Sequence, residues 1–202
     1  MTVHSSDTET FRGTGKRERI LRAAVEVFAR RGYFNAKVAE IARVAGVADG
    51  TIYLYFQGKE DLLITIFREH MKDYLKRLET NLEGERTAVE QIRRIIAFHL
   101  DALGRDRSLA VVFQVELRQS VKFMSELSHE GVTEYLVILK HVVERGQAAG
   151  EFRADLQPQL IANSIFGVLD EMVTRWILSE KEYALSDHSE GISDFILRGL
   201  AG

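Results

Sequence analysis

The hydrophobic positions of this chain recur at the spacing of α-helices along most of its length. The first periodic run begins at Lys16 and ends at Gly32, and its apolar face consists of Ile20, Ala23, Ala24, Val27 and Phe28. Two short helices are expected at 38–45 and 49–56, with Gly46 between them. After Gly58, a long amphipathic helix is expected over 59–82.

The rest of the chain continues this pattern with five more expected helices, at 87–104, 108–120, 121–149, 157–178 and 189–200. Pro158, the one proline, falls in the first turn of the fourth of these, where helices tolerate it. The segment 108–120 is apolar on nearly every side, so we expect it to be central and buried. No alternation of period two extends far enough for a strand. The sequence therefore predicts an all-α fold.

The sequence divides into three segments that differ in composition and in expected role. Residues 1–15 are polar and aperiodic, which predicts a disordered arm. We expect a three-helix, helix-turn-helix DNA-binding domain at 16–60, and a helical ligand-binding and dimerisation bundle at 61–202. Charge supports this division, since residues 12–59 carry ten Lys/Arg against four Asp/Glu, whereas residues 60–202 carry seventeen against twenty-four. A basic segment joined to an acidic one indicates that only the first meets a polyanion.

Residues 37–56 read as a helix, a glycine turn at Gly46 and a second short helix, the arrangement that presents a recognition helix to the major groove. The chain resembles the TetR-type repressors in the segments 23–28, 32–33, 38–42, 46–47, 50–56 and 59–62. The resemblance implies that Gly50 and Thr51 lie closest to the base edges. A helix-turn-helix can also be a purely structural corner, but the basic charge and exposed polar pattern here favour DNA binding.

The candidate DNA-binding residues are Lys37, Ala48, Asp49, Gly50, Thr51, Tyr53, Tyr55 and Lys59. Tyr53 and Tyr55 cannot both point inward, so at least one hydroxyl is free to bind a phosphate. Lys59 begins the long helix, where its charge adds to the positive end of the helix dipole. Lys37 and Ala48 replace the Thr and Ser usual in the family. Asp49 opposes the DNA backbone, but it could accept a hydrogen bond from a cytosine amino group.

The helices between residues 99 and 176 are expected to enclose a cavity for a small hydrophobic ligand. Its candidate lining residues are Phe98, His99, Phe113, Gln114, Leu117, Arg118, Phe123, Leu136, Leu139, Phe166 and Leu169. Apolar residues of this kind are more often plain core. Glu116 and Arg118 nevertheless need partners if they are buried, and they point to different sides of a helix. Arg118 therefore needs another anion, from the protein or from a ligand.

Segments 49–56, 115–120 and 166–171 also resemble the TetR-type regulators of fatty-acid degradation. That resemblance implies a long-chain acyl-CoA as effector, with no other cofactor. A multidrug-sensing repressor of the same fold remains an alternative. It would favour acidic or aromatic walls for cationic drugs.

The resemblance also implies a homodimer through the last two helices. The segment 157–178 is apolar on more than one stripe, for which a second partner is the economical explanation. The candidate interface residues are Ile161, Ile165, Met172, Trp176, Ile192, Phe195 and Ile196. A dimer would place two recognition helices about 34 Å apart, one turn of B-DNA.

Other functions find less support. The six histidines have no metal-ligand spacing, and a core role for His99 is an open alternative to ligand binding. A small helical enzyme would need a catalytic constellation, and we find no phosphate-binding loop, nucleophile elbow or carboxylate pair. An architectural protein that coats DNA would need a basic body. With no cysteine, no signal peptide and no apolar run long enough to span a bilayer, we expect a cytoplasmic protein that does not bind membranes.

Overall fold

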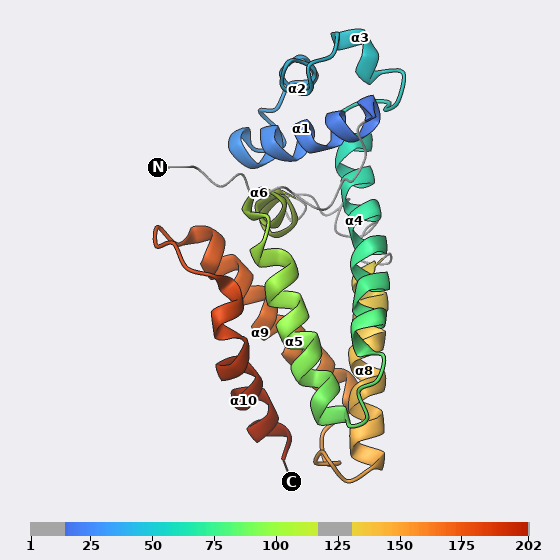
Figure 1. Ribbon diagram of the computed structural model, residues 1–202, viewed down its shortest axis with the longest axis vertical. Helices are drawn as coiled ribbons and strands as arrows, with labels where there is room; N and C mark the ends of the chain where they lie inside the picture. The colour runs from blue at the N-terminus through green and yellow to red at the C-terminus, as the bar shows by residue number, and fades with distance from the viewer. Residues whose placement is uncertain (1–14, 117–130, 202) are drawn as a thin grey trace. The chain divides into compact units, whose positions relative to one another are not determined.

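The computed structural model describes residues 15–116 and 131–201, and within them every regular element is a helix (Figure 1). The all-α expectation is confirmed. The α-helices are α1 (Lys16–Arg31), α2 (Val38–Ala45), α3 (Asp49–Ile52), α4 (Lys59–Leu82), α5 (Ala88–Gly104), α6 (Arg107–Val111), α8 (Thr133–Ala148), α9 (Pro158–Leu178) and α10 (Ser189–Leu200). Two further turns are a π-helical one, η1 (Val112–Glu116), and a 3₁₀ one, η4 (Leu185–His188).

The chain forms two compact units, and each is described here by itself. Among the described residues, the first unit contains 15–70 and 105–116, and the second contains 71–104 and 131–201. The first unit therefore includes residues well beyond 60, which the sequence placed with the ligand-binding bundle. The expected domains at 16–60 and 61–202 are a functional division, and we keep them below as a proposal. The expected arm at 1–15 lies almost wholly outside the described residues.

In the first unit, α1 packs against α2, α6 and η1, and α2 packs against α3. The apolar stripe of α1 is buried as its period predicts, with Ile20, Val27 and Phe28 fully enclosed. Gly32 ends α1 at a φ of 75°, and Gly46 ends α2 in the left-handed region at 66°. Both glycines directly follow the last residue of a helix, the position at which a glycine with positive φ commonly ends it.

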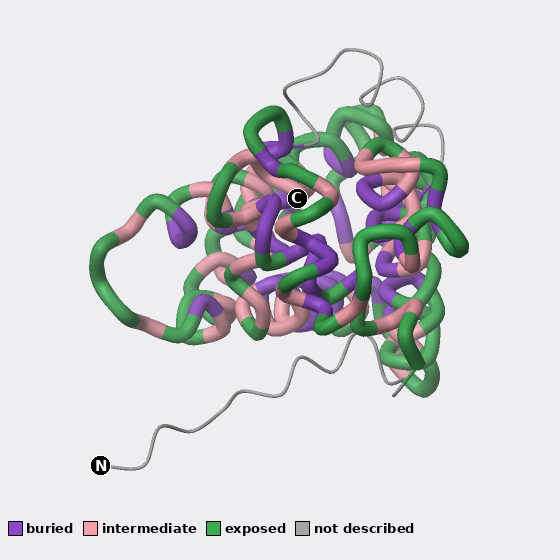
Figure 2. Tube along the Cα trace, turned by 90° about the horizontal axis from the view of Figure 1, so that it is seen from above, coloured by how far each residue is buried: buried purple, intermediate pink, exposed green. Residues whose placement is uncertain are grey.

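In the second unit, α5 is the central helix. It packs against α8, α9, α10 and η4, and α8 and α9 also pack together. Figure 2 shows the buried positions gathered on the inner faces of the helices. Among the described helices none is long and apolar enough to cross a membrane.

Three expected helices differ from the observed elements. The helix expected at 49–56 is regular only to Ile52, because the backbone then tightens into turns in which Leu54 and Tyr55 donate to carbonyls three residues back. The helix expected at 108–120 starts as α6 and widens into the π-helical η1 after Val111. The helix expected at 121–149 is observed as α8 from Thr133, and Gly131 precedes it at a φ of 87°.

Candidate nucleic-acid interface and effector site

The turn between α2 and α3 is built around Gly46. Its N–H donates to the carbonyls at the end of α2, and its left-handed backbone reverses the chain without a Cβ in the way. Ile41, Ala42 and Ile52 are fully buried on either side of this turn. The apolar contacts hold α3 by its inner face and leave its outer face to the solvent.

The outer face of α3 and the turn after it carries most of the predicted DNA-binding residues. Ala48, Asp49, Gly50, Tyr53 and Tyr55 are exposed, and Thr51 is half-buried. Both tyrosines therefore face outward, where the sequence required only one to do so. Leu54, which the sequence analysis did not single out, is 80% exposed. An exposed leucine between two exposed tyrosines makes a surface that can contact both the sugar-phosphate backbone and apolar groups such as a thymine methyl.

The two predicted lysines have different environments. Lys37 is the exposed residue at the start of α2. The Lys59 ammonium instead donates to the carbonyls of Tyr33 and Phe34, both at 2.9 Å, and lies 4.7 Å from the centre of the Tyr33 ring. Lys59 thus stabilises the turn between α1 and α2, and its role as a phosphate ligand stays a prediction.

The same turn is also held by Glu116. This residue is 4% exposed, and its carboxylate accepts a hydrogen bond of 2.6 Å from the backbone N–H of Tyr33. The carboxylate oxygens also lie 3.8 Å from the place that a Cβ of Gly32 would occupy. The sequence analysis stated that a buried Glu116 needs a partner, and the structure identifies that partner as a backbone amide.

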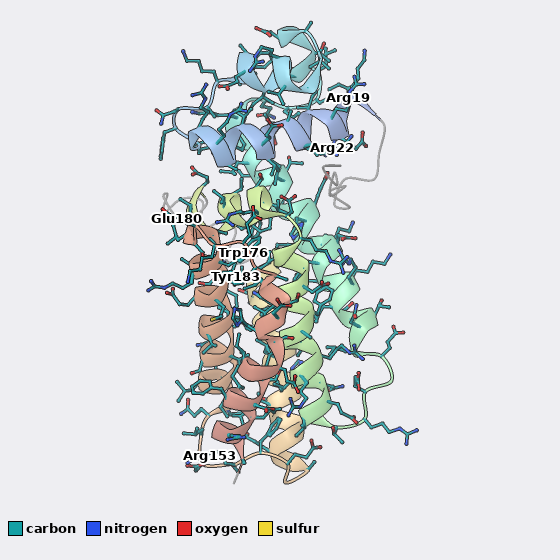
Figure 3. The ribbon with its side chains drawn as sticks, turned by 60° about the vertical axis from the view of Figure 1, so that its left-hand side comes forward. Arg19, Arg22, Arg153, Trp176, Glu180 and Tyr183 are labelled. Carbon is teal, nitrogen blue, oxygen red and sulfur yellow. The ribbon has the colours of Figure 1, made fainter. Side chains whose placement is uncertain are left out.

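A cleft of about 390 Å³ opens on the first unit between α1, α2 and the start of α6. Arg19 and Arg22 lie along it on α1, as labelled in Figure 3, and Glu26 and Asp106 also line it. Burial raises the pKa of Asp106, whose side chain caps α6 by accepting from the Leu109 N–H. Because both signs of charge meet here, the cleft provides no single-sign field for a polyanion.

In the second unit, the rings of Tyr74, His99 and Tyr135 meet in the interior. The Tyr74 hydroxyl is 2.9 Å from Nδ1 of His99, and the His99 and Tyr135 ring centres are 5.6 Å apart. We call these three residues the polar triad. Phe98 packs on Tyr74 at 5.0 Å, and Phe166 packs on Tyr135 at 5.9 Å. Three predicted ligand residues, Phe98, His99 and Phe166, are thereby brought together.

All three groups of the triad are uncharged at neutral pH. Burial lowers the pKa of the His99 imidazole to about 4, although the carboxylate of Asp170 opposes this shift. Burial also raises the pKa of the Tyr74 and Tyr135 phenols. The triad is a neutral polar cluster in an apolar surrounding. The sequence analysis named neither tyrosine as a candidate site residue and missed the cluster.

The remaining predicted ligand residues are distributed differently. Leu139 and Leu169 are buried in the second unit, and Leu136 is half-buried there. Phe113 belongs to the first unit, where its ring packs 4.9 Å from that of His70 and 5.5 Å from that of Phe67, and Gln114 follows it in η1. Leu117, Arg118 and Phe123 lie outside the described residues. In residues 15–116 and 131–201, no three His, Asp or Glu side chains gather as metal ligands.

The predicted interface residues divide into two groups. Ile161, Ile165, Trp176 and Ile196 are buried inside the second unit, and Trp176 donates from Nε1 to the Tyr183 carbonyl at 3.1 Å (Figure 3). Phe195 is 71% exposed, and Met172 and Ile192 are half-buried. Leu160 and Leu178 on α9 are exposed as well. The apolar residues of α9 and α10 that are exposed and can contact a partner chain are therefore Leu160, Leu178 and Phe195. Most of the interface residues that the helical spacing predicted are buried inside the unit instead.

Comparison with known proteins gives two family matches. The family of bacterial regulatory proteins named tetR matches residues 20–66, and the C-terminal region of YsiA-like proteins matches residues 67–199. The fatty acid metabolism regulator protein of Bacillus subtilis (strain 168) is 40% identical over 181 residues, which cover 90% of this chain and 93% of that protein.

Two solved structures are similar over nearly the whole chain. The fatty acid degradation regulator FadR from Bacillus halodurans has a TM-score of 0.86 and 36% identity, covering 94% of this chain and 98% of its own. The transcriptional regulator FadR from Bacillus subtilis, in complex with stearoyl-CoA, has a TM-score of 0.84 and 38% identity, covering 90% and 98%. The helices of both units thus have counterparts in known regulators.

Removal of the Glu116 carboxylate should destabilise the first unit. In Glu116→Ala the buried N–H of Tyr33 loses its acceptor, and we expect a loss of about 1–3 kcal/mol in the free energy of unfolding. Glu116→Gln keeps an acceptor oxygen and should recover much of that loss. Chemical denaturation measures both, with Glu79→Ala on the exposed side of α4 as the control. Equal stability of Glu116→Ala and the control would contradict the assignment.

The buried imidazole should make stability depend on pH. His99 has a native pKa of about 4, against about 6.5 when unfolded, so between these values the unfolded chain binds a proton that the native state does not. Its contribution is complete above pH 6.5 and is lost as the pH falls toward 4, by about 3 kcal/mol in all. His99→Asn should flatten this part of the denaturation profile. The exposed His141→Asn should not, and identical profiles for the two variants would disprove the assignment.

Proposed function

Since the chain belongs to the TetR family of bacterial regulatory proteins, we propose that it is a transcriptional repressor that binds a palindromic operator as a dimer and is released by a long-chain acyl-CoA. The observation that carries the proposal is the likeness to a fatty acid metabolism regulator over 90% of the chain. The similar structure that holds stearoyl-CoA supports the choice of effector. Residues 16–60 serve as the DNA-binding domain and residues 61–202 as the ligand-binding and dimerisation domain.

DNA binding rests on the outer face of α3. The exposed side chains Tyr53, Leu54 and Tyr55 stand next to Gly50, where the absence of a side chain lets the backbone approach the base edges. Two such faces in a dimer read the two halves of a palindrome.

The effector is a hydrophobic molecule that interacts with the apolar interior of the second unit. Phe98, Leu139, Phe166 and Leu169 supply aromatic and aliphatic surface there. Each buried methylene of an acyl chain contributes about 0.8 kcal/mol, so a chain of about sixteen carbons can supply the few kcal/mol that shift a two-state regulator. The assignment of Arg118 as an anchor for the phosphates of CoA stays a sequence prediction.

The release of DNA requires that the effector prefer one conformation. Glu116 and α4 are the elements through which such a preference can reach the DNA-binding surface. The chain passes from the first unit to the second within α4, and the segment that follows α5 folds back into the first unit, where Glu116 binds the turn before α2. A shift of this segment would move the turn and, with it, α2 and α3.

Operator release provides the test of this function. Selection from genomic DNA fragments should yield a palindromic site, and fluorescence anisotropy then follows its release. Palmitoyl-CoA should release the DNA, whereas free CoA and the cationic dye rhodamine 6G should not. Release by the dye and not by palmitoyl-CoA would favour a multidrug-sensing repressor. Failure to select any DNA would refute the proposed function itself.

The two lysines should differ in their effect on the salt dependence of operator binding. Lys37→Ala should reduce the slope of log affinity against log salt by about one, because one phosphate contact is lost. Lys59→Ala should lower thermal stability with little change in slope, since its ammonium binds carbonyls of the protein. Lys76→Ala on α4 is the exposed control. A loss of slope in Lys59→Ala equal to that in Lys37→Ala would assign Lys59 to phosphate.

The dimer should depend on the exposed apolar residues of α9 and α10. Phe195→Glu replaces the exposed aromatic ring of α10 with a charge and should weaken dimerisation and operator binding together. Val137→Glu, on the exposed face of α8, should leave both intact. Sedimentation at micromolar concentration measures the oligomeric state. A Phe195→Glu variant that stays dimeric would place the interface elsewhere.

A further inference from the structure

Two polar atoms in the interior of the second unit are not hydrogen-bonded within the part of the chain that the structure describes. They are Nε2 of His99 and the hydroxyl oxygen of Tyr135. His99 is 5% exposed and Tyr135 is 2% exposed, so both atoms are shielded from bulk solvent. Native proteins rarely leave such groups unsatisfied, and the exceptions often have a functional reason.

The two atoms belong to the polar triad, which four helices surround. Tyr74 comes from α4, His99 from α5 and Tyr135 from α8, and Phe166 of α9 packs on Tyr135. The His99 and Tyr135 ring centres are 5.6 Å apart, close enough for one small group to interact with both side chains. Phe98 lies against Tyr74, so aromatic rings enclose the triad. A ligand that reaches it must carry a polar group within a largely apolar molecule.

The chemistry of the triad selects a neutral hydrogen-bond acceptor. When the Tyr74 hydroxyl donates to Nδ1 of the neutral imidazole, the ring proton resides on Nε2, which becomes a donor. The Tyr135 hydroxyl, which also interacts with the Tyr74 hydroxyl, is a second donor. An anion is disfavoured, because burial keeps the His99 imidazole uncharged and the carboxylate of Asp170 acts on the same residue.

We propose that His99 and Tyr135 donate hydrogen bonds to the thioester carbonyl oxygen of the acyl-CoA, and that Tyr74 fixes the His99 tautomer. This inference rests on the proposed function, since it assigns the part of that effector which the triad recognises. A thioester is the neutral carbonyl that joins the acyl chain to CoA. The triad would therefore make the regulator sense the activated acyl group and not the alkyl chain alone.

The test compares two ligands that differ only at the carbonyl. Palmitoyl-CoA has the thioester, and S-hexadecyl-CoA has a methylene in its place. Isothermal titration calorimetry on the full-length protein should show wild type binding the thioester about five- to tenfold more tightly, as expected for the loss of one or two net hydrogen bonds.

Two variants remove one donor each. Tyr135→Phe deletes only the hydroxyl, and His99→Asn keeps a polar group near the position of Nδ1 but removes Nε2. Each should reduce the preference for the thioester while binding S-hexadecyl-CoA about as well as wild type. Tyr183→Phe makes the same atomic change outside the triad and should keep the full preference.

The outcomes separate this inference from the proposed function. If wild type binds both ligands equally, the triad does not recognise the carbonyl, and the effector assignment still stands. If Tyr135→Phe and His99→Asn both keep the wild-type preference, another part of the protein binds the carbonyl. If wild type binds neither ligand, the acyl-CoA effector is refuted and this assignment with it.

Discussion

The buried carboxylate of Glu116 is the contact on which the first unit depends most. It satisfies the N–H of Tyr33 at the point where α1 has ended and α2 has not begun, in a turn that belongs to neither helix. Lys59 binds the carbonyls of Tyr33 and Phe34 in the same turn. A carboxylate and an ammonium thus substitute for regular secondary structure at the junction that sets the direction of α2, and the apolar contacts of Ile41 and Ile52 carry that direction to α3.

The second unit, unlike the first, buries polar groups that carry no charge. Its interior contains an imidazole and two phenols but keeps all of them neutral, because burial disfavours their charged forms. Neutral groups cost less to bury than ions, and they can rearrange their protons without building up charge. The first unit uses charge to hold a fixed geometry, whereas the second keeps the polar groups of its interior neutral.

Most of the helices and the exposed face of α3 could be predicted from the sequence because both depend on local pattern. Each of these features depends on residues that are close together in the sequence. Examples are the helical period of α1, the glycine turn at Gly46 and the alternation of buried Ile52 with the exposed tyrosines. The partner of Glu116 could not be predicted, because Tyr33 lies 83 residues away. Periodicity also identified Ile161, Ile165 and Trp176 as apolar, but it does not say whether a helix buries such residues in its own unit or against another chain. The triad stayed hidden for a related reason, since its three members come from three different helices.

The position of Glu116 in the chain affects how regulators of this kind can be recombined. A protein engineer who joins the DNA-reading segment of one regulator to the sensor of another would naturally cut between residues 60 and 70. Such a hybrid would take its reading segment from one parent and the residue corresponding to Glu116 from the other, although the two are neighbours in the folded first unit. Hybrids of this design need a matched acid at that position, or a second crossover that transplants residues 105–116 along with the reading segment.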